Sequence, residues 1–493
     1  MVSSADNSTP MKLLVAIASY GVGNDKYLAR LVQEYQSMSF AADVVVCSNV
    51  EKPVPAGVEL IVGLPTRDPW SLPFAHKKIL AERSGDYDLF IYSEDDMLLT
   101  ERNLRAFLWA SSILKDNELA GVFQFECDAD GQRSFPAMHA NFHWDPQSVE
   151  IRGSETFAYF TCEHSACYVL TRAQLQRAIA SGGFLVPPYS GKYDLACTAA
   201  TDPYTRCGFR KLICISKMED FLVHHLPNKY VGTRFGTGEE QLRRELDVLL
   251  ALGETRERPE PLFPTQTRFP DCAFSKDYRE PAHLKALSLI PGNVRTVLSY
   301  GCGTGDTEAR LADRGVRVTA VPLDRVIPGR ELEEKCELLW GDLPGLREQL
   351  EGRSFDCLLL LNALRFVEDP AAVLATLARA LSGPSQVVIV EPNMALWFLR
   401  ARIRGGGNLR SFRDYRQSGV HRTSHGVLRC WCRQAGIAVN EIIDVVPERR
   451  QRASTLGLRF LDPWLGSEMI MAGERVMSGV ASVSRQTGLS AGC

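Results

Sequence analysis

The chain has 493 residues, more than the roughly 250–300 at which a single hydrophobic core stops growing, so we expect two or three domains. Hydrophobic residues make up 45% and charged residues 23% of the chain, which excludes a disordered or fibrous protein. With 56 basic and 59 acidic residues, the net charge of −3 gives no overall attraction for nucleic acid or for an anionic membrane surface.

The first apolar run, Leu13–Ala18, is short and follows a polar stretch. This pattern favours a buried strand over the core of a secretory signal. The apolar runs of the sequence are all shorter than the ~18–20 residues that a membrane-spanning helix needs. We therefore expect a cytoplasmic protein without a transmembrane segment, in contact with a membrane peripherally at most, and no nucleic-acid partner.

Residues 11–237 show a first alternation of strand-like and helix-like patterns. This alternation predicts an α/β domain. The predicted helices are Tyr27–Met38 and Phe74–Ser84, and the predicted strands are Leu13–Ser19, Asp43–Ser48, Glu59–Gly63 and Tyr87–Tyr92.

The last of these strands runs into three clustered carboxylates, Glu94, Asp95 and Asp96. Carboxylates at the exposed end of a strand are hard oxygen ligands for a divalent cation that bridges two phosphates. The segment DYDLFIYSEDDM resembles the Asp-x-Asp motif of GT-A-fold glycosyltransferases, with Glu94 and Asp96 at the outer positions. A solvated acidic turn is the alternative.

The resemblance implies a GT-A-like domain that transfers a sugar from a nucleotide sugar to a saccharide or a glycosylated small molecule. Ser19 and Tyr20 follow the first strand, where such enzymes hold the nucleotide, and Asp95 is a third candidate for binding the nucleotide sugar. Glu94 and Asp96 would bind Mn²⁺ or Mg²⁺, which would neutralise the leaving diphosphate.

A second constellation lies in the segment ISKMEDFLVHH. Its order resembles the acidic pair and later histidine of many GT-A enzymes. The resemblance implies that Asp220 or Glu219 is the base that deprotonates the acceptor, and that His224 or His225 completes the metal shell.

Residues 238–281 begin with charge-rich helical sequence and continue with prolines, a composition that predicts a linker. A second strand and helix alternation covers residues 282–476, and the small polar tail 477–493 is expected to be frayed. The predicted strands of this block are Arg295–Tyr300, Arg317–Val321, Cys336–Trp340, Phe355–Leu361 and Gln386–Val390.

The first strand of the second block ends in Gly301, Gly303 and Gly305. Alternating glycines allow a tight turn and a close approach of a ligand at the carboxyl end of a strand. The strings VLSYGCGTG, WGDL, FDCLLLLNALRFVEDP and VVIVEPN resemble the ordered motifs of class I S-adenosylmethionine-dependent methyltransferases, and SHGVLRCWCRQAGI resembles their late helix. The implied fold is a Rossmann-like α/β domain.

By this resemblance the three glycines would pass under the methionine and ribose parts of S-adenosyl-L-methionine. Asp342 matches the acid that meets the adenine amino group, and Asn362 faces the reaction centre. Two positions depart from the family pattern, because Ser299 and Pro322 stand where acids are usual. Binding of both ribose hydroxyls then requires that Asp324 takes over the second role.

A direct methyl transfer needs a positioned nucleophile and a proton acceptor. His421 and His425 are candidate bases, with a solvated loop histidine as the alternative for each. The segment Leu399–Arg422 is rich in arginine, which suits an anionic acceptor, although a solvated flexible lid fits as well.

The sequence therefore favours a two-domain α/β enzyme that combines glycosyl transfer with S-adenosylmethionine-dependent methylation, for which O-methylation of a saccharide is the expected reaction. One alternative is a methyltransferase whose N-terminal domain only binds substrate. The other is a glycosyltransferase whose methyltransferase domain is degenerate, in line with Ser299 and Pro322.

Overall fold

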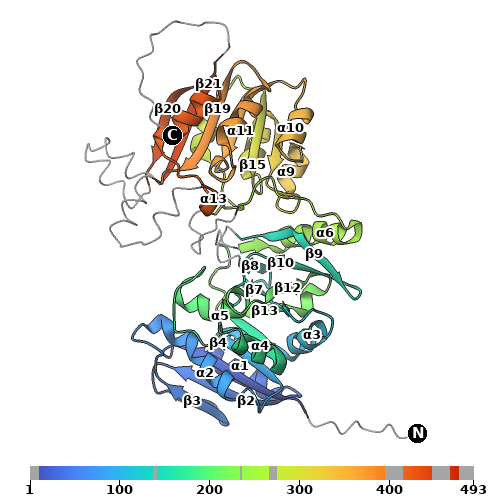
Figure 1. Ribbon diagram of the computed structural model, residues 1–493, viewed down its shortest axis with the longest axis vertical. Helices are drawn as coiled ribbons and strands as arrows, with labels where there is room; N and C mark the ends of the chain where they lie inside the picture. The colour runs from blue at the N-terminus through green and yellow to red at the C-terminus, as the bar shows by residue number, and fades with distance from the viewer. Residues whose placement is uncertain are drawn as a thin grey trace. The chain divides into compact units, whose positions relative to one another are not determined.

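The computed structural model describes residues 10–136, 142–233, 236–265, 275–394, 415–446 and 467–476. The chain divides into two compact units, Met1–Arg258 (unit 1) and Pro259–Cys493 (unit 2), each built around its own β-structure (Figure 1). The predicted α/β class is confirmed. Along the part of the chain that is described, no helix is long and apolar enough to cross a membrane.

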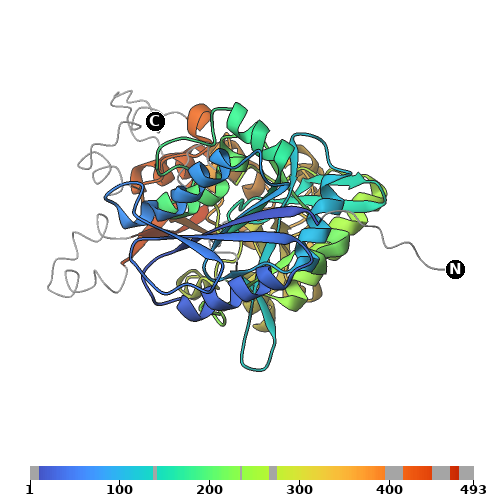
Figure 2. The same cartoon turned by 90° about the horizontal axis from the view of Figure 1, so that it is seen from below.

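The main sheet of unit 1 has the strand order β11-β4-β1-β2-β3, with β11 antiparallel to four parallel strands. Its central strands are continuous apolar runs because helices cover both faces, as the blue strands in Figure 2 show. The strands are β1 (Lys12–Ser19), β2 (Ala41–Ser48), β3 (Val58–Val62), β4 (Leu89–Glu94) and β11 (Cys167–Thr171), and the main helices are α1 (Asp25–Ser37), α2 (Ala75–Glu82) and α4 (Arg172–Ala180).

Two smaller sheets complete unit 1, with the orders β6-β12-β10-β9 and β14-β8-β7-β13-β5. The second of them carries β13 antiparallel to β5, which sets His225 opposite Met97 directly after the acidic cluster. The elements are α3 (Glu101–Ser111), β5 (Met97–Leu98), β6 (Glu118–Ala120), β7 (Phe123–Cys127), β8 (Arg133–Pro136), β9 (Trp144–Arg152), β10 (Glu155–Phe160), α5 (Leu195–Thr205), β12 (Arg210–Cys214), β13 (Leu222–His225) and β14 (Gly236–Gly238).

The structure differs from the linker predicted over residues 238–281. Helix α6 (Glu239–Thr255) buries Leu242, Leu249 and Leu252 and packs against strands of unit 1. The leucines lie on one face of the helix, and the charged residues on its other face gave the segment the overall composition of a linker. The described residues after 258 belong to unit 2, where Phe263 and Tyr278 are part of the hydrophobic core.

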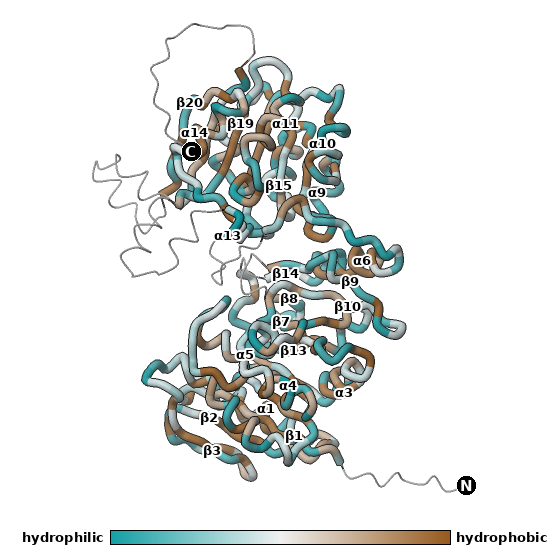
Figure 3. The backbone as a smooth tube through the Cα atoms, in the orientation of Figure 1, coloured by the Kyte–Doolittle hydropathy of each residue, from teal (hydrophilic) through white to brown (hydrophobic). Residues whose placement is uncertain are grey.

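Unit 2 contains a seven-stranded sheet of order β17-β16-β15-β18-β19-β21-β20. Strands β15 to β19 are parallel, and β21 runs antiparallel to both β19 and β20. Figure 3 shows hydrophobic residues along β19 and hydrophilic residues in loops around the sheet. The strands are β15 (Thr296–Cys302), β16 (Arg317–Pro322), β17 (Glu337–Leu338), β18 (Phe355–Leu361), β19 (Leu381–Pro392), β20 (Ile437–Val445) and β21 (Glu468–Arg475).

Helices flank this sheet, and the direction of strand progression reverses between β15 and β18. In an open parallel sheet such a reversal leaves a crevice at the carboxyl ends of the two strands, where ligands bind. The helices are α7 (Leu284–Ser288), α8 (Asp306–Asp313), α9 (Arg330–Lys335), α10 (Leu343–Gln349), α11 (Pro370–Ala378), α13 (Tyr415–Ser418) and α14 (His425–Gln434). The predicted tail 477–493 and positions 399–414 of the arginine-rich segment lie outside the described residues.

Candidate functional site

The glycine loop lies at this crevice, between the end of β15 and the start of α8. Gly301 and Gly305 have φ angles of +79° and +94°, a conformation that side chains disfavour. A Cβ at Gly301 would also lie 2.6 Å from the Cβ of Ala363, and one at Gly303 would meet the backbone carbonyl of Tyr278. The loop therefore requires glycine for both its turn and its close contacts.

The segment Ser275–His283, which we call the strap, covers the glycine loop. The Tyr278 carbonyl accepts a 3.0 Å hydrogen bond from the Thr304 backbone N–H. The His283 backbone N–H donates to Thr307 Oγ1 at 3.1 Å, at the start of α8. Lys276 Nζ donates to the carbonyl of Leu361 at 2.6 Å, so the strap also reaches the end of β18.

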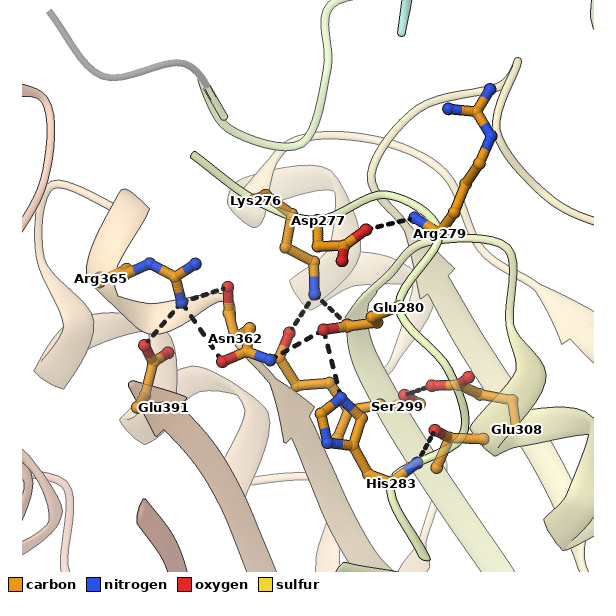
Figure 4. A network of polar contacts seen from close by, with 12 residues as sticks. Lys276, Asp277, Arg279, Glu280, His283, Ser299, Glu308, Asn362, Arg365 and Glu391 are labelled. Atoms are coloured by element: carbon orange, nitrogen blue, oxygen red, sulfur yellow. Dashed lines mark hydrogen bonds and ion pairs between the residues drawn. The ribbon is translucent and has the colours of Figure 1, made fainter. Parts of the chain in front are cut away.

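The strap brings a buried charged cluster to the crevice (Figure 4). The Lys276 side chain is fully buried and pairs with Glu280. Asn362 Nδ2 donates to Glu280 Oε2 at 2.8 Å, and His283 Nε2 lies 3.2 Å from the same oxygen. Burial disfavours the charged form of Glu280, but Lys276 and His283 outweigh it and lower its pKa to about 2. Glu280 is therefore an anion throughout the neutral range.

Asn362 connects this cluster to a second ion pair. It has a φ of +53°, which an asparagine tolerates better than most residues. Arg365 Nη1 lies 3.4 Å from Asn362 Oδ1 and 3.2 Å from Glu391 Oε2. Glu391 also accepts from the Leu364 backbone N–H at 2.7 Å. The turn after β18 is thus tied to the end of β19, and Asn362 faces the crevice from between the two pairs.

The two departures from the methyltransferase pattern have structural counterparts. Ser299 Oγ donates to Glu308 Oε1 at 2.5 Å, so α8 brings a carboxylate next to Ser299. Both side chains are buried, and burial raises the pKa of Glu308. Pro322 ends β16, and Asp324 follows it with a 4% exposed side chain whose Oδ1 accepts from the Val326 and Ile327 N–H groups.

The remaining candidates of unit 2, Asp342, His421 and His425, contact other residues than the Lys276 and Glu280 cluster. Asp342 is exposed and caps α10, where its Oδ1 accepts from the Gly345 N–H at 2.9 Å. His421 Nε2 contacts the backbone carbonyls of Val367 and Glu368, and His425 Nε2 lies 2.9 Å from Asp444 Oδ1. Neither histidine has a recorded side-chain contact with the Lys276 and Glu280 cluster.

Sequence reasoning missed Lys276, Glu280 and His283. Lys276 and Glu280 fall within the predicted linker of residues 238–281, because its prolines and charges resemble a boundary when the fold is unknown, and His283 falls at the start of the predicted block 282–476. No local pattern marks the three residues, because Ser275–His283 is not helical and the cluster forms only when the strap packs on the sheet.

In unit 1 the acidic cluster lines a cavity of about 430 Å³ at the carboxyl ends of β1 and β4. Exposed aromatic rings of Tyr20 and Trp70 and the ammonium group of Lys229 line it as well. Burial, together with the charges of Asp96 and Asp95, raises the pKa of Glu94 to about 8. The cavity thus places three carboxyl groups beside flat apolar faces.

Asp95 is held by the loop that follows β1. Its Oδ2 accepts from Ser19 Oγ at 2.5 Å and its Oδ1 from Asn24 Nδ2 at 2.8 Å. Lys52 Nζ donates to the same Ser19 hydroxyl at 2.5 Å and to Asp25 at 2.8 Å. Ser19 and Asp95, both candidates for binding the nucleotide sugar, are therefore in direct contact.

Only one of the two predicted histidines faces the acidic cluster. His225 Nε2 lies 3.5 Å from Asp96 Oδ2, and its Nδ1 lies 2.5 Å from Glu126 Oε1. His224 points to the other face of β13, as neighbouring residues of a strand must, and stacks on Phe125. Of the two alternatives, His225 is therefore the histidine that faces the acidic cluster.

The structure also separates Glu219 and Asp220 from the acidic cluster. They precede β13, whose far end carries His225 some ~10 Å beyond Leu222 at ~3.3 Å per residue. Arg133 binds Glu219 and Arg102 binds Asp220, both at the surface of unit 1. The predicted grouping of these acids with Glu94 and Asp96 is wrong, because the strand intervenes.

Across the described ranges, no group of three or more His, Cys, Asp or Glu side chains is arranged to hold a metal ion. Asp96 lies near one ring nitrogen of His225, and Glu126 lies near the other. The metal shell expected from Glu94, Asp96 and a histidine is thus not assembled in this structure.

This chain is similar to known methyltransferases. Residues 242–442 match a family model described as a methyltransferase domain. The ubiquinone biosynthesis O-methyltransferase of Azotobacter vinelandii is 26% identical over 180 residues, which cover 33% of this chain and 73% of that protein. The corresponding enzyme of Pseudomonas paraeruginosa is 26% identical over 166 residues, covering 30% and 67%.

Solved structures also align with this chain. An S-adenosylmethionine-dependent methyltransferase from Mesorhizobium loti has a TM-score of 0.30 and 19% identity, covering 39% of this chain and 96% of its own. The magnesium protoporphyrin IX methyltransferase from Synechocystis, solved with bound SAH, has a TM-score of 0.27 and 14% identity, covering 39% and 78%.

Proposed function

We propose, from the premise that the C-terminal region is a class I S-adenosylmethionine-dependent methyltransferase domain, that this chain methylates a hydroxyl group of its acceptor. The observation that carries the proposal is the glycine loop at the strand reversal between β15 and β18. The O-methyltransferase names of the sequence relatives favour oxygen as the atom methylated. A saccharide or a glycosylated small molecule remains our expected acceptor.

The residues present fit S-adenosyl-L-methionine. Gly301 and Gly305 allow the turn of the loop at the carboxyl end of β15, and Gly303 accommodates the carbonyl of Tyr278 from the strap. Asp324 offers a carboxylate to the ribose hydroxyls, and Asp342 would meet the adenine amino group. When bound, the donor supplies an activated methyl group on a sulfonium. The protein then has to position the acceptor and take up its proton.

The expected result for the wild-type chain is binding of S-adenosylhomocysteine in isothermal titration calorimetry. Asp324→Asn keeps the oxygen that caps the Val326 and Ile327 N–H groups but removes the negative charge. Loss of a charged hydrogen bond of ~1.5–3 kcal/mol should weaken binding about 10-fold to 100-fold.

Asp313→Asn is the matched control, because Asp313 is an exposed residue of α8 that pairs with Lys335. Its affinity for S-adenosylhomocysteine should equal that of the wild type. A wild-type chain that gives no binding heat would contradict the methyltransferase proposal.

A second candidate function concerns unit 1, and the cavity beside Glu94, Asp95 and Asp96 is what favours it. We infer that this cavity binds a nucleotide sugar, with aromatic faces for flat rings and carboxylates for a divalent cation. Glu94 and Asp96 would hold the cation, and glycosyl transfer from the bound nucleotide sugar would be the reaction. A unit 1 that only binds substrate for the methyltransferase is the competing possibility.

Release of nucleoside diphosphate from a panel of nucleotide sugars, with and without Mn²⁺, tests the second function. Asp96→Asn should abolish the manganese-dependent release, because it removes a carboxylate from the cavity. Asp220→Asn should retain it, because Asp220 pairs with Arg102 away from that cavity. Equal release by wild type and Asp96→Asn would refute glycosyl transfer at this cavity.

A further inference from the structure

Glu468 is an acidic residue at the crevice of unit 2 that no sequence motif singles out. It is the first residue of β21 and lies opposite Pro392 at the end of β19. Because β21 is antiparallel to β19, its first residue reaches the edge of the sheet where the parallel strands end. The Glu468 side chain is 26% exposed, whereas that of Glu280 is 10% exposed. Glu468 is therefore the more accessible carboxylate of the two.

His283 lies between these two carboxylates. Its Nδ1 is 3.7 Å from Glu468 Oε1, and its Nε2 is 3.2 Å from Glu280 Oε2. The backbone N–H of His283 is bonded to Thr307, two residues after the last glycine of the loop. Glu468 therefore contacts the ring of a residue, His283, whose backbone is anchored beside the glycine loop.

The polar and charged groups around Glu468 come from two elements. The strap contributes His283 and Glu280, with Lys276 behind them, and the turn after β18 contributes Asn362 and Arg365. Burial raises the pKa of Glu468, while His283 lowers it and Glu280 raises it further, and the net shift is upward. A carboxylate with a raised pKa is better matched to proton transfer near neutral pH than an ordinary one.

We propose that Glu468 accepts the proton of the acceptor hydroxyl during methyl transfer, with His283 as a positioning residue that holds its carboxylate. The inference rests on the methyltransferase function proposed above. As the acceptor oxygen bonds to the methyl carbon, the carbon–sulfur bond breaks with its electron pair on sulfur, and the hydroxyl proton passes to an Oε atom of Glu468. The sulfonium charge is lost in the same step in which the carboxylate is neutralised.

Proton-linked calorimetry tests this placement without knowledge of the acceptor. S-adenosylmethionine carries a sulfonium charge that S-adenosylhomocysteine lacks. A cation near Glu468 favours its ionised form, so the methionine compound should release more protons on binding at mildly acidic pH. Titrations of the full chain in buffers with different ionisation heats measure that difference.

The difference in proton release should be lost in Glu468→Gln and retained in Glu474→Gln. Glu474 is the matched control because it lies on the same strand, is exposed, and contacts Asn440 instead of the cluster. In His283→Gln the pKa of Glu468 should rise, since a cation is removed, so the difference should appear at higher pH. A purely structural role of His283 would not move that pH.

The outcomes separate the two proposals. If neither compound binds the wild-type chain, the methyltransferase function itself fails. If both bind and release equal numbers of protons at every pH, or if Glu468→Gln keeps the difference, the assignment of Glu468 is overturned while the methyltransferase function stands.

Discussion

Replacing Glu280 by glutamine is expected to lower the free energy of unfolding of unit 2 by about 3–5 kcal/mol, the usual cost of leaving a buried charge without its partner. The Lys276 side chain is fully buried, and Glu280 is the carboxylate with which it pairs. In the variant, the Lys276 ammonium group still donates to the Leu361 carbonyl, but it faces a neutral amide at position 280 instead of a carboxylate. Urea denaturation, followed by hydrogen exchange of peptides from β15 and β18, measures the loss.

Two further variants make this prediction specific. The double variant Lys276→Met with Glu280→Leu should recover most of the stability, because neither charge is left buried alone. Glu348→Gln, an exposed residue of α10, should unfold as the wild type does. If Glu280→Gln were as stable as Glu348→Gln, the buried pair would not support the fold.

The pH dependence follows from the pKa of Glu280, which is held at about 2 in the folded protein. An unfolded glutamate titrates near ~4.3, so the folded chain binds fewer protons between these values. The stabilisation from Glu280 is fully present above about pH 4.3 and is lost as the pH falls toward 2. The gap between wild type and Glu280→Gln should therefore narrow over this range.

The parts of unit 2 that could be predicted from sequence are those where neighbouring residues in the chain form the feature by themselves, such as a strand followed by a glycine turn. Gly301 and Gly305 follow an apolar strand, and the structure places both at the strand reversal with positive φ angles. The Ser299 departure could be noticed, but its partner Glu308 could not, because that contact depends on how α8 packs over β15.

The long-range contacts explain what sequence missed or misplaced. Glu280 and Glu468 are far apart in the chain, and only the sheet order and the path of the strap bring them to one crevice. In unit 1, Glu219 and Asp220 are close to His225 in sequence, yet β13 carries them to its opposite end. Proximity along a strand is a poor guide to proximity in space.

The second large effect is expected at the strap when the methyl donor site is filled. The Tyr278 carbonyl packs against Gly303 and accepts a hydrogen bond from the Thr304 N–H. A ligand that binds the glycine loop should therefore also affect the strap. We expect saturating S-adenosylhomocysteine to slow amide exchange at least about 10-fold in peptides that contain the loop, since bound ligand stabilises the closed state by mass action.

A pair of glycine variants isolates the close approach of the strap. Gly303→Ala adds a Cβ that would overlap the Tyr278 carbonyl, so the strap should be displaced and the ligand-induced protection should be lost. Gly292→Ala is the control, because a Cβ there meets no atom within 4 Å. Its protection by the ligand should match that of the wild type.

A methyl-donor site at the glycine loop is tested by the exchange footprint of S-adenosylhomocysteine on the wild-type chain. We expect slower exchange in peptides covering Gly301–Gly305, Asp324 and the strap, and unchanged exchange around the cavity of unit 1. Unchanged exchange in those peptides of unit 2, or protection confined to unit 1, would contradict a methyl-donor site at the carboxyl ends of β15 and β18.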